Sequence, residues 1–160
     1  MSNDDADLRH VHEGHSRIAG GDTTVEYVVE IDAPPEIVYS LWTSADGLAR
    51  WWGRALAVEA TPGGPIHIDL GRPVMIGEFI TVERPHRFVF SFGWSTPTPD
   101  GDLPPWSTTV EVTIRATSTG SRLTLRHHGL PGEHRASHAH GWQLFLGRLA
   151  AANTGANDAR

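Results

Sequence analysis

Near the end of the chain, residues 132–152 read GEHRASHAHGWQLFLGRLAAA, the one long segment with the apolar period of a helix. Positions suited to a buried helix face recur in steps of three and four, at His138, Trp142, Phe145, Leu149 and Ala152. Steps of this size place the side chains on one face of the helix. Most of the upstream chain alternates with period two, as strands do. We therefore expect one helix that lies across a sheet and covers its apolar face.

Gly141 lies inside this predicted helix, where a glycine costs about 1 kcal/mol relative to alanine. We expect a compensating close approach of the helix backbone to a bulky neighbour, such as an aromatic side chain of the sheet or Trp51. Trp142 should then be buried and hold the helix against the sheet.

The composition is that of one ordinary globular domain: 160 residues, of which 39% are hydrophobic and 20% charged. The formal net charge of −6 disfavours nucleic-acid binding, because such proteins usually carry a basic patch. No apolar run reaches the roughly 18 residues that predict a membrane span. The acidic N-terminus lacks the hydrophobic core of a secretory signal, so we expect a cytoplasmic protein. Without cysteine the chain has no thiolate nucleophile and no cysteine-based metal site.

Polarity divides the chain into a polar tail at residues 1–22, a single domain at residues 23–153 and a second tail at residues 154–160. The first tail contains His10, His12 and His15. Three histidines on a flexible segment would bind a metal weakly, since a structural zinc site normally has four fixed ligands. We expect no metal there.

The order of the predicted elements is informative. Two short helices follow the first strand, one over about residues 33–42 and one from Ser44 to Trp52. Only strands then precede the final helix. The seven predicted strands cover residues 24–31, 55–60, 66–70, 74–83, 88–94, 107–116 and 121–128. Their short connections predict a curved antiparallel sheet and an α+β domain.

Several short motifs occur in a fixed order between Thr24 and Ala152. They are Ile31-Asp-Ala-Pro-Pro-Glu36, Trp51-Trp52-Gly53, Gly77 followed by Glu83-Arg-Pro85, Phe92-Gly-Trp94, Gly120-Ser-Arg-Leu-Thr-Leu125, His128-Gly-Leu-Pro131 and His140-Gly-Trp142. In these motifs and their spacing the chain resembles the helix-grip fold of the Bet v 1-like (START, SRPBCC) superfamily. Within that superfamily it is similar to the bacterial domains related to activators of the heat-shock-90 ATPase. The resemblance implies a seven-stranded sheet wrapped around the C-terminal helix, with an internal cavity between them.

Apolar and aromatic side chains on the predicted inner positions are typical of a small-molecule site. We therefore expect the domain to bind a small hydrophobic or aromatic molecule, without a cofactor. The predicted ligand-binding residues are Trp52, Phe90, Phe92, Trp94, Val112, His127, Trp142, Phe145 and Leu149.

Two alternatives stay open, and a third is disfavoured. Glu78 and His127 fall on predicted inner positions and could act as acid and base in an enzyme of the cyclase or hydrolase type, unless the strand register is shifted by one residue. The resemblance also allows a module that binds a chaperone. Finally, His134 and His138 share a helix face, as two zinc ligands would, but no third ligand is identifiable and we predict no metal site.

Overall fold

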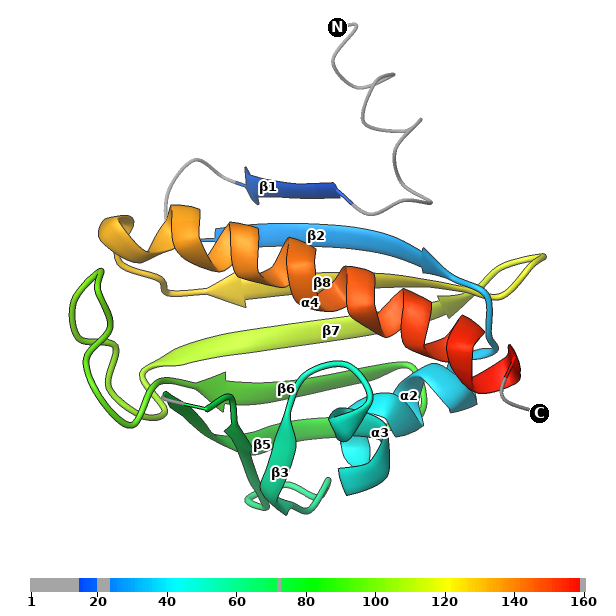
Figure 1. Cartoon of the computed structure of the whole chain (residues 1–160), viewed down its shortest axis with the longest axis horizontal. Coiled ribbons are helices and arrows are strands. Elements are labelled where there is room, and N and C mark those ends of the chain that lie inside the picture. Colours follow the sequence, from blue (N-terminus) through cyan, green and yellow to red (C-terminus); the bar gives the residue numbers. More distant parts are fainter. Residues whose placement is uncertain (1–14, 20–23, 72, 159–160) are drawn as a thin grey trace, which may run out of the picture.

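One long helix crosses one face of an antiparallel sheet (Figure 1). The structure, a computed structural model, describes residues 15–19, 24–71 and 73–158. The sheet contains β1 (His15–Ala19), β2 (Thr24–Ile31), β3 (Arg54–Val58), β4 (Pro65–Asp69), β5 (Val74–Glu83), β6 (Arg87–Phe92), β7 (Thr108–Ala116) and β8 (Ser121–His128). Their spatial order is β1-β2-β8-β7-β6-β5-β4-β3. The helices are α2 (Pro35–Thr43), α3 (Ala45–Ala49) and α4 (Gly132–Asp158).

Strands β2 to β8, the two short helices after the first of them and the final helix confirm the predicted helix-grip architecture. Two boundaries differ from the prediction. β1 lies in the segment predicted to be a tail and pairs with β2, with Ile18 opposite Val25. Without β1, the strand β2 would be the edge of the sheet, with unpaired backbone N–H and C=O groups. Another segment can pair with these groups without alternating apolar residues. Helix α4 also runs five residues further than the predicted domain, because extending a helix is much easier than starting one.

Period-two alternation gives β7 and β8 one apolar face, the inner face, which is turned toward α4. Val112 lies opposite Leu125, and Val110 lies opposite His127. All four side chains are fully buried. The alternation therefore assigns these residues to the core, as the sequence predicted.

The face of β5 differs from the prediction. Met75 and Phe79 are fully buried, whereas Glu78 is exposed. Gly77 shares the inner face, and a side chain there would collide with the Ser91 carbonyl oxygen, 1.9 Å from an added Cβ. The expectation that Glu78 faces the cavity is therefore wrong. Apolar residues occupy both faces of this strand, so alternation could not identify the buried one.

The two short helices close one end of the sheet (Figure 1). The Ser44 side chain accepts a hydrogen bond from the Gly47 backbone N–H, 3.0 Å away, and so caps α3. Trp51 donates its indole N–H to the Leu41 carbonyl oxygen at 2.8 Å. This connection fixes the turn that follows α3 and brings Trp52 against the middle of α4, where its ring centroid lies 5.3 Å from that of Trp142.

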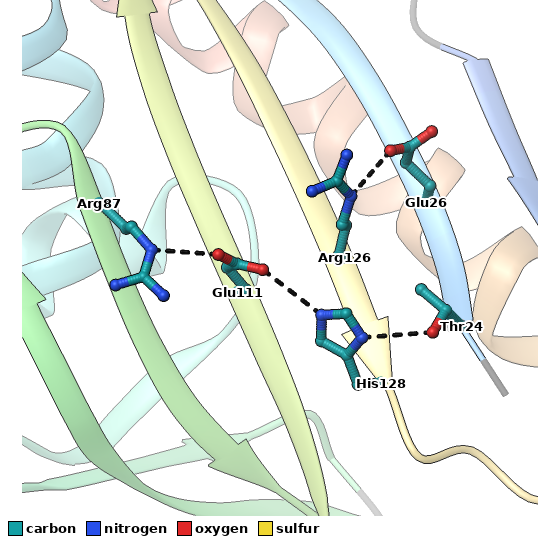
Figure 2. A network of polar contacts seen from close by, with 6 residues as sticks. All are labelled: Thr24, Glu26, Arg87, Glu111, Arg126 and His128. Atoms are coloured by element: carbon teal, nitrogen blue, oxygen red, sulfur yellow. Dashed lines mark hydrogen bonds and ion pairs between the residues drawn. The ribbon is translucent and has the colours of Figure 1, made fainter. Parts of the chain in front are cut away.

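The outer face of the sheet, turned away from α4, is polar (Figure 2). Arg87 binds Glu111 at 3.0 Å, and Glu111 is 3.4 Å from His128. Arg126 forms a 2.9 Å pair with Glu26 on the neighbouring strand. These pairs are partly exposed through their arginines. Ion pairs at a protein surface add about 0–1 kcal/mol each, so the inner face carries most of the stability. Among the described helices, none is long and apolar enough to cross a membrane.

Candidate functional site

A pocket of about 290 Å³ lies between the first half of α4, the end of β6 and the loop that connects β6 with β7. Tryptophan and phenylalanine rings form a large part of its wall, and exposed Pro99 and Ser137 form part of its rim. Its lining residues are Trp52, Pro73, Phe92, Trp94, Thr98, Pro99, Asp100, Ser137, His138, Gly141, Trp142 and Phe145. The volume is at the small end of the ~300–1,000 Å³ usual for ligand pockets.

Strand β6 supplies one side of the wall. Its alternation turns Phe92 inward, and the rings of Phe92 and Trp52 are stacked with centroids 6.5 Å apart. Gly93 follows, and an added Cβ there would lie 1.9 Å from the Pro104 carbonyl oxygen. This close approach lets the returning loop cover the strand end, and the Trp94 backbone N–H donates to the Leu103 carbonyl oxygen at 2.8 Å. Trp94 is thereby fixed beside Phe92, with 5.1 Å between the ring centroids.

The opposite side of the wall is connected to Trp94 through His138 on α4. The Trp94 indole N–H donates to His138 Nε2 at 3.1 Å. His138 Nδ1 lies 2.8 Å from the His134 carbonyl oxygen, which can only accept. His138 is therefore neutral with its proton on Nδ1. Burial lowers the pKa of His138, against the opposing effects of the His134 carbonyl and the negative charge of Asp100.

A second imidazole holds Trp142 from the sheet side. The Trp142 indole N–H donates to His127 Nδ1 at 3.0 Å. His127 Nε2 is 2.8 Å from the Thr108 hydroxyl oxygen, and that hydroxyl donates to the Phe92 carbonyl oxygen at 2.8 Å. The proton of His127 therefore lies on Nε2, the opposite tautomer to His138.

His127 is completely buried, and burial lowers its pKa well below the ordinary value, with His138 and His128 lowering it further. Both ring nitrogens of His127 and both of His138 are hydrogen-bonded within the chain. The two imidazoles thus hold Trp94 and Trp142 at fixed positions. Neither has a free nitrogen with which to take a proton from a bound molecule.

The polar part of the rim is a tight turn at residues 98–101. The backbone N–H groups of Thr98 and Gly101 each donate to the other residue's carbonyl oxygen at 2.9 Å. Gly101 has a φ of 114°, which favours glycine. His134, buried in the first turn of α4, is 3.2 Å from the Asp102 carbonyl oxygen through Nε2 and so ties this loop to the helix.

Gly141 has a different role from the one predicted. An added Cβ at Gly141 would meet no atom within 4 Å, and the same is true at Gly147. No bulky neighbour approaches the helix at Gly141, so the expected close contact is wrong. The absent side chain leaves space for the pocket, which Gly141 lines and Gly147 does not.

The structure brings five of the predicted ligand-binding residues together on the pocket wall: Trp52, Phe92, Trp94, Trp142 and Phe145. The other four lie in the surrounding core and are fully buried: Phe90, Val112, His127 and Leu149. Of the two predicted acid–base candidates, Glu78 is exposed on the outer face and His127 is buried behind Trp142. Sequence reasoning missed Thr98 and Asp100 as site residues, because they lie on a loop, whose position no periodicity predicts.

Two metal sites were considered from the sequence, one at the N-terminal histidines and one at His134 and His138. His134 and His138 point their nitrogens at carbonyl oxygens and at Trp94, except for His134 Nδ1, which is buried without a partner. No group of three or more His, Cys, Asp or Glu side chains gathers within residues 15–19, 24–71 and 73–158. His10 and His12 lie outside these residues, and His15 begins β1.

A second hollow, of about 700 Å³, lies on the outer face of the sheet. Three of the four arginines that line it, Arg87, Arg122 and Arg126, are already paired with glutamates. The aromatic pocket is therefore the better candidate for a small-molecule site.

Comparison with known proteins places the chain among related domains. The sequence profile of the family described as "Activator of Hsp90 ATPase homolog 1-like protein" matches residues 32–153. No curated protein matches the sequence. Protein MLL2253 from Mesorhizobium loti is similar in structure, with a TM-score of 0.72 and 21% identity over 82% of this chain and 96% of that one. The AHSA1-like protein from Aeromonas hydrophila has a TM-score of 0.66 and 20% identity over 84% and 94%.

A third structure, DynU16, is described as a protein in the dynemicin biosynthetic locus. Its TM-score is 0.69 and its identity 27%, over 81% of this chain and 46% of DynU16, so this chain spans just under half of that protein. At the low identities of the first two structures, the likeness shows the shared fold.

Proposed function

The chain belongs to the Activator of Hsp90 ATPase homolog 1-like family, and on this premise we propose that it binds a small aromatic molecule in the pocket between α4 and β6. The observation that carries the proposal is the wall of the pocket. Five of its twelve lining residues are tryptophan or phenylalanine. Flat apolar walls with a few polar groups at one end suit an aromatic ligand.

The size of the pocket limits the occupant. Its 290 Å³ would hold about ten water molecules at ~30 Å³ each. This volume suits a ligand with about two fused rings. Aromatic pairs are worth about 0.5–1.5 kcal/mol beyond their buried area, so such a ring gains from Trp52, Phe92 and Trp142 together.

Binding is better supported than proton transfer. All four ring nitrogens of His127 and His138 form hydrogen bonds inside the protein. An enzyme using either imidazole would first have to break one of these bonds. The family's name refers to activation of the Hsp90 ATPase, which would involve a surface that contacts another protein, whereas the pocket favours a small molecule.

A titration with flavones, fatty acids and naphthylmethanol tests the proposal, with the indole N–H resonances of the tryptophans as reporters. A pocket ligand should shift the resonances of Trp52, Trp94 and Trp142. Trp106 is 56% exposed and does not line the pocket, so it is an internal control that should stay unchanged. The proposal fails if no compound shifts the three pocket indoles at millimolar concentration, or if Trp106 alone responds.

A further inference from the structure

The charge around the pocket is uneven. Among the described residues that line the pocket, Asp100 is the one with a formal charge, since the hydrogen bonds of His138 make that ring neutral. No lysine or arginine among the described residues lines the pocket. Among those residues, no hydrogen bond or ion pair engages the Asp100 side chain, and only its backbone N–H is bonded, to the Thr98 hydroxyl oxygen at 3.1 Å. A half-buried carboxylate beside aromatic rings therefore keeps its acceptor capacity for a ligand.

The backbone that carries Asp100 is held in place. Asp100 lies at the tip of the turn closed by the two backbone hydrogen bonds between Thr98 and Gly101. The next residue, Asp102, is anchored to α4 through its carbonyl oxygen and His134. The negative charge of Asp100 raises the pKa of His138, against the larger effect of burial. The electrostatic effect of the carboxylate therefore reaches a residue of the pocket wall.

The two ends of the pocket differ in the sign of the nearby charge. At the far end from Asp100, the guanidinium of Arg148 lies over the Phe145 ring, 5.4 Å from its centroid. Arg148 is one turn further along α4 than Phe145 and does not line the pocket. A ligand with a positive group would be repelled from the Phe145 end and attracted to the Asp100 end.

Aromatic walls add to this preference. The faces of Trp and Phe rings attract cations, by about 0.5–2 kcal/mol depending on how far the cation is desolvated. The net charge of −6 also favours the approach of cations over anions.

From these observations we infer that the pocket selects an arylalkylamine, whose aromatic ring lies between Trp52, Phe92 and Trp142 and whose aliphatic ammonium group binds the Asp100 carboxylate. The inference rests on the proposed function and names the ligand class of the same site. Thr98 and Ser137, whose hydroxyl groups lie on the rim, are positioned to accept further hydrogen bonds from the ammonium group.

Three ligands with the same ring test the inference: naphthylmethylamine, naphthylmethanol and naphthoate, which are cationic, neutral and anionic at neutral pH. Their affinities are measured by calorimetry for the wild type, for Asp100→Asn and for Asp102→Asn. Asparagine suits tight turns as well as aspartate does, so Asp100→Asn should keep the loop. Asp102→Asn is the matched control, because Asp102 is exposed on the same loop, carries the same charge and does not line the pocket.

The wild type should bind the amine about tenfold more tightly than the alcohol, the size expected of one charge-assisted hydrogen bond. Naphthoate should bind most weakly. Asp100→Asn should remove the preference for the amine over the alcohol, whereas Asp102→Asn should retain this preference.

Two results would overturn the inference while leaving the proposed function intact: equal binding of amine and alcohol by the wild type, or equal loss of the preference in both variants. If none of the three ligands binds and the pocket indoles also stay unshifted with every compound of the first panel, the proposed function fails, and the inference fails with it.

Discussion

The indole N–H of Trp142 donates to Nδ1 of His127 over 3.0 Å, and this hydrogen bond joins α4 to β8 inside the core. Trp142 also packs against the rings of Trp52 and Phe92, with centroids 5.3 and 5.9 Å away. One side chain thus holds the helix against the sheet and forms part of the pocket wall.

Removing this side chain should destabilise the fold. We expect Trp142→Ala to lower the free energy of unfolding by about 3–5 kcal/mol, as large-to-small changes in a core do. Trp142→Phe keeps a ring but leaves His127 Nδ1 without its donor, for which we expect a smaller loss of about 1–3 kcal/mol. Urea denaturation measures both. A loss of less than about 1 kcal/mol for Trp142→Ala would mean that the helix is not held through this residue.

The two imidazoles should be neutral and in opposite tautomers at neutral pH. Since Trp142 and Trp94 can only donate, His127 must carry its proton on Nε2 and His138 must carry its proton on Nδ1. Long-range nitrogen–proton spectra of the histidine rings distinguish the two forms directly. Two rings in the same tautomer, or a doubly protonated His127, would contradict the hydrogen-bond pattern.

Stability should fall as the pH drops below about 6.5, the ordinary pKa of histidine. Because burial lowers the pKa of His127, the unfolded chain binds a proton in this range that the folded chain excludes. The stabilisation is therefore complete above the unfolded pKa and is lost on acidification, by about 1.4 kcal/mol per pH unit for each such histidine. His138, whose pKa is lowered too, should add to the slope.

Urea denaturation at about pH 7 and about pH 5.5 measures this loss. A His127→Asn variant should start less stable and lose less on acidification. The control is His140→Asn, which changes an exposed histidine of α4 and should keep the wild-type slope. Equal stability of the wild type at the two pH values would contradict the lowered pKa.

Gly141 and Gly147, both inside α4, should tolerate alanine. An added Cβ meets open space at Gly141 and at Gly147, so each change should stabilise the helix by up to about 1 kcal/mol. Thermal unfolding of the two variants provides the comparison. A destabilised Gly141→Ala beside a stabilised Gly147→Ala would show that a neighbour approaches the helix at Gly141 after all.

Much of the fold could be predicted because its periodicities are regular. β7 and β8 alternate without interruption, and the aromatic residues of β6 are spaced by two, so their inner faces follow from the sequence. The same reasoning failed for β5, because both of its faces carry apolar residues: Ile76 and Ile80 on one face, Met75 and Phe79 on the other.

On α4, the prediction selected Trp142 and Leu149 but missed Leu146, which is fully buried and stands four residues after Trp142. The same spacing rule could have identified it.

The site itself was only partly predictable. The aromatic wall follows from strand and helix periods, whereas the position of Asp100 depends on a loop that Gly93 and His134 hold against the strand end and the helix. Such tertiary contacts leave no period in the sequence. The role of Gly141 was misjudged for a related reason: a glycine can indicate either a close neighbour or an empty space, and only the structure distinguishes them.

The most direct test of ligand binding in this pocket fills it from α4. Gly141→Leu would place a side chain inside the pocket, and Gly147→Leu would place the same side chain outside it on the same helix. Naphthylmethanol is the probe, because it is neutral and its binding does not require a charge on Asp100. Calorimetry should find that Gly141→Leu loses binding while Gly147→Leu retains the wild-type affinity, with both variants folded. Unchanged binding by Gly141→Leu would contradict the proposal that the pocket between α4 and β6 holds the ligand.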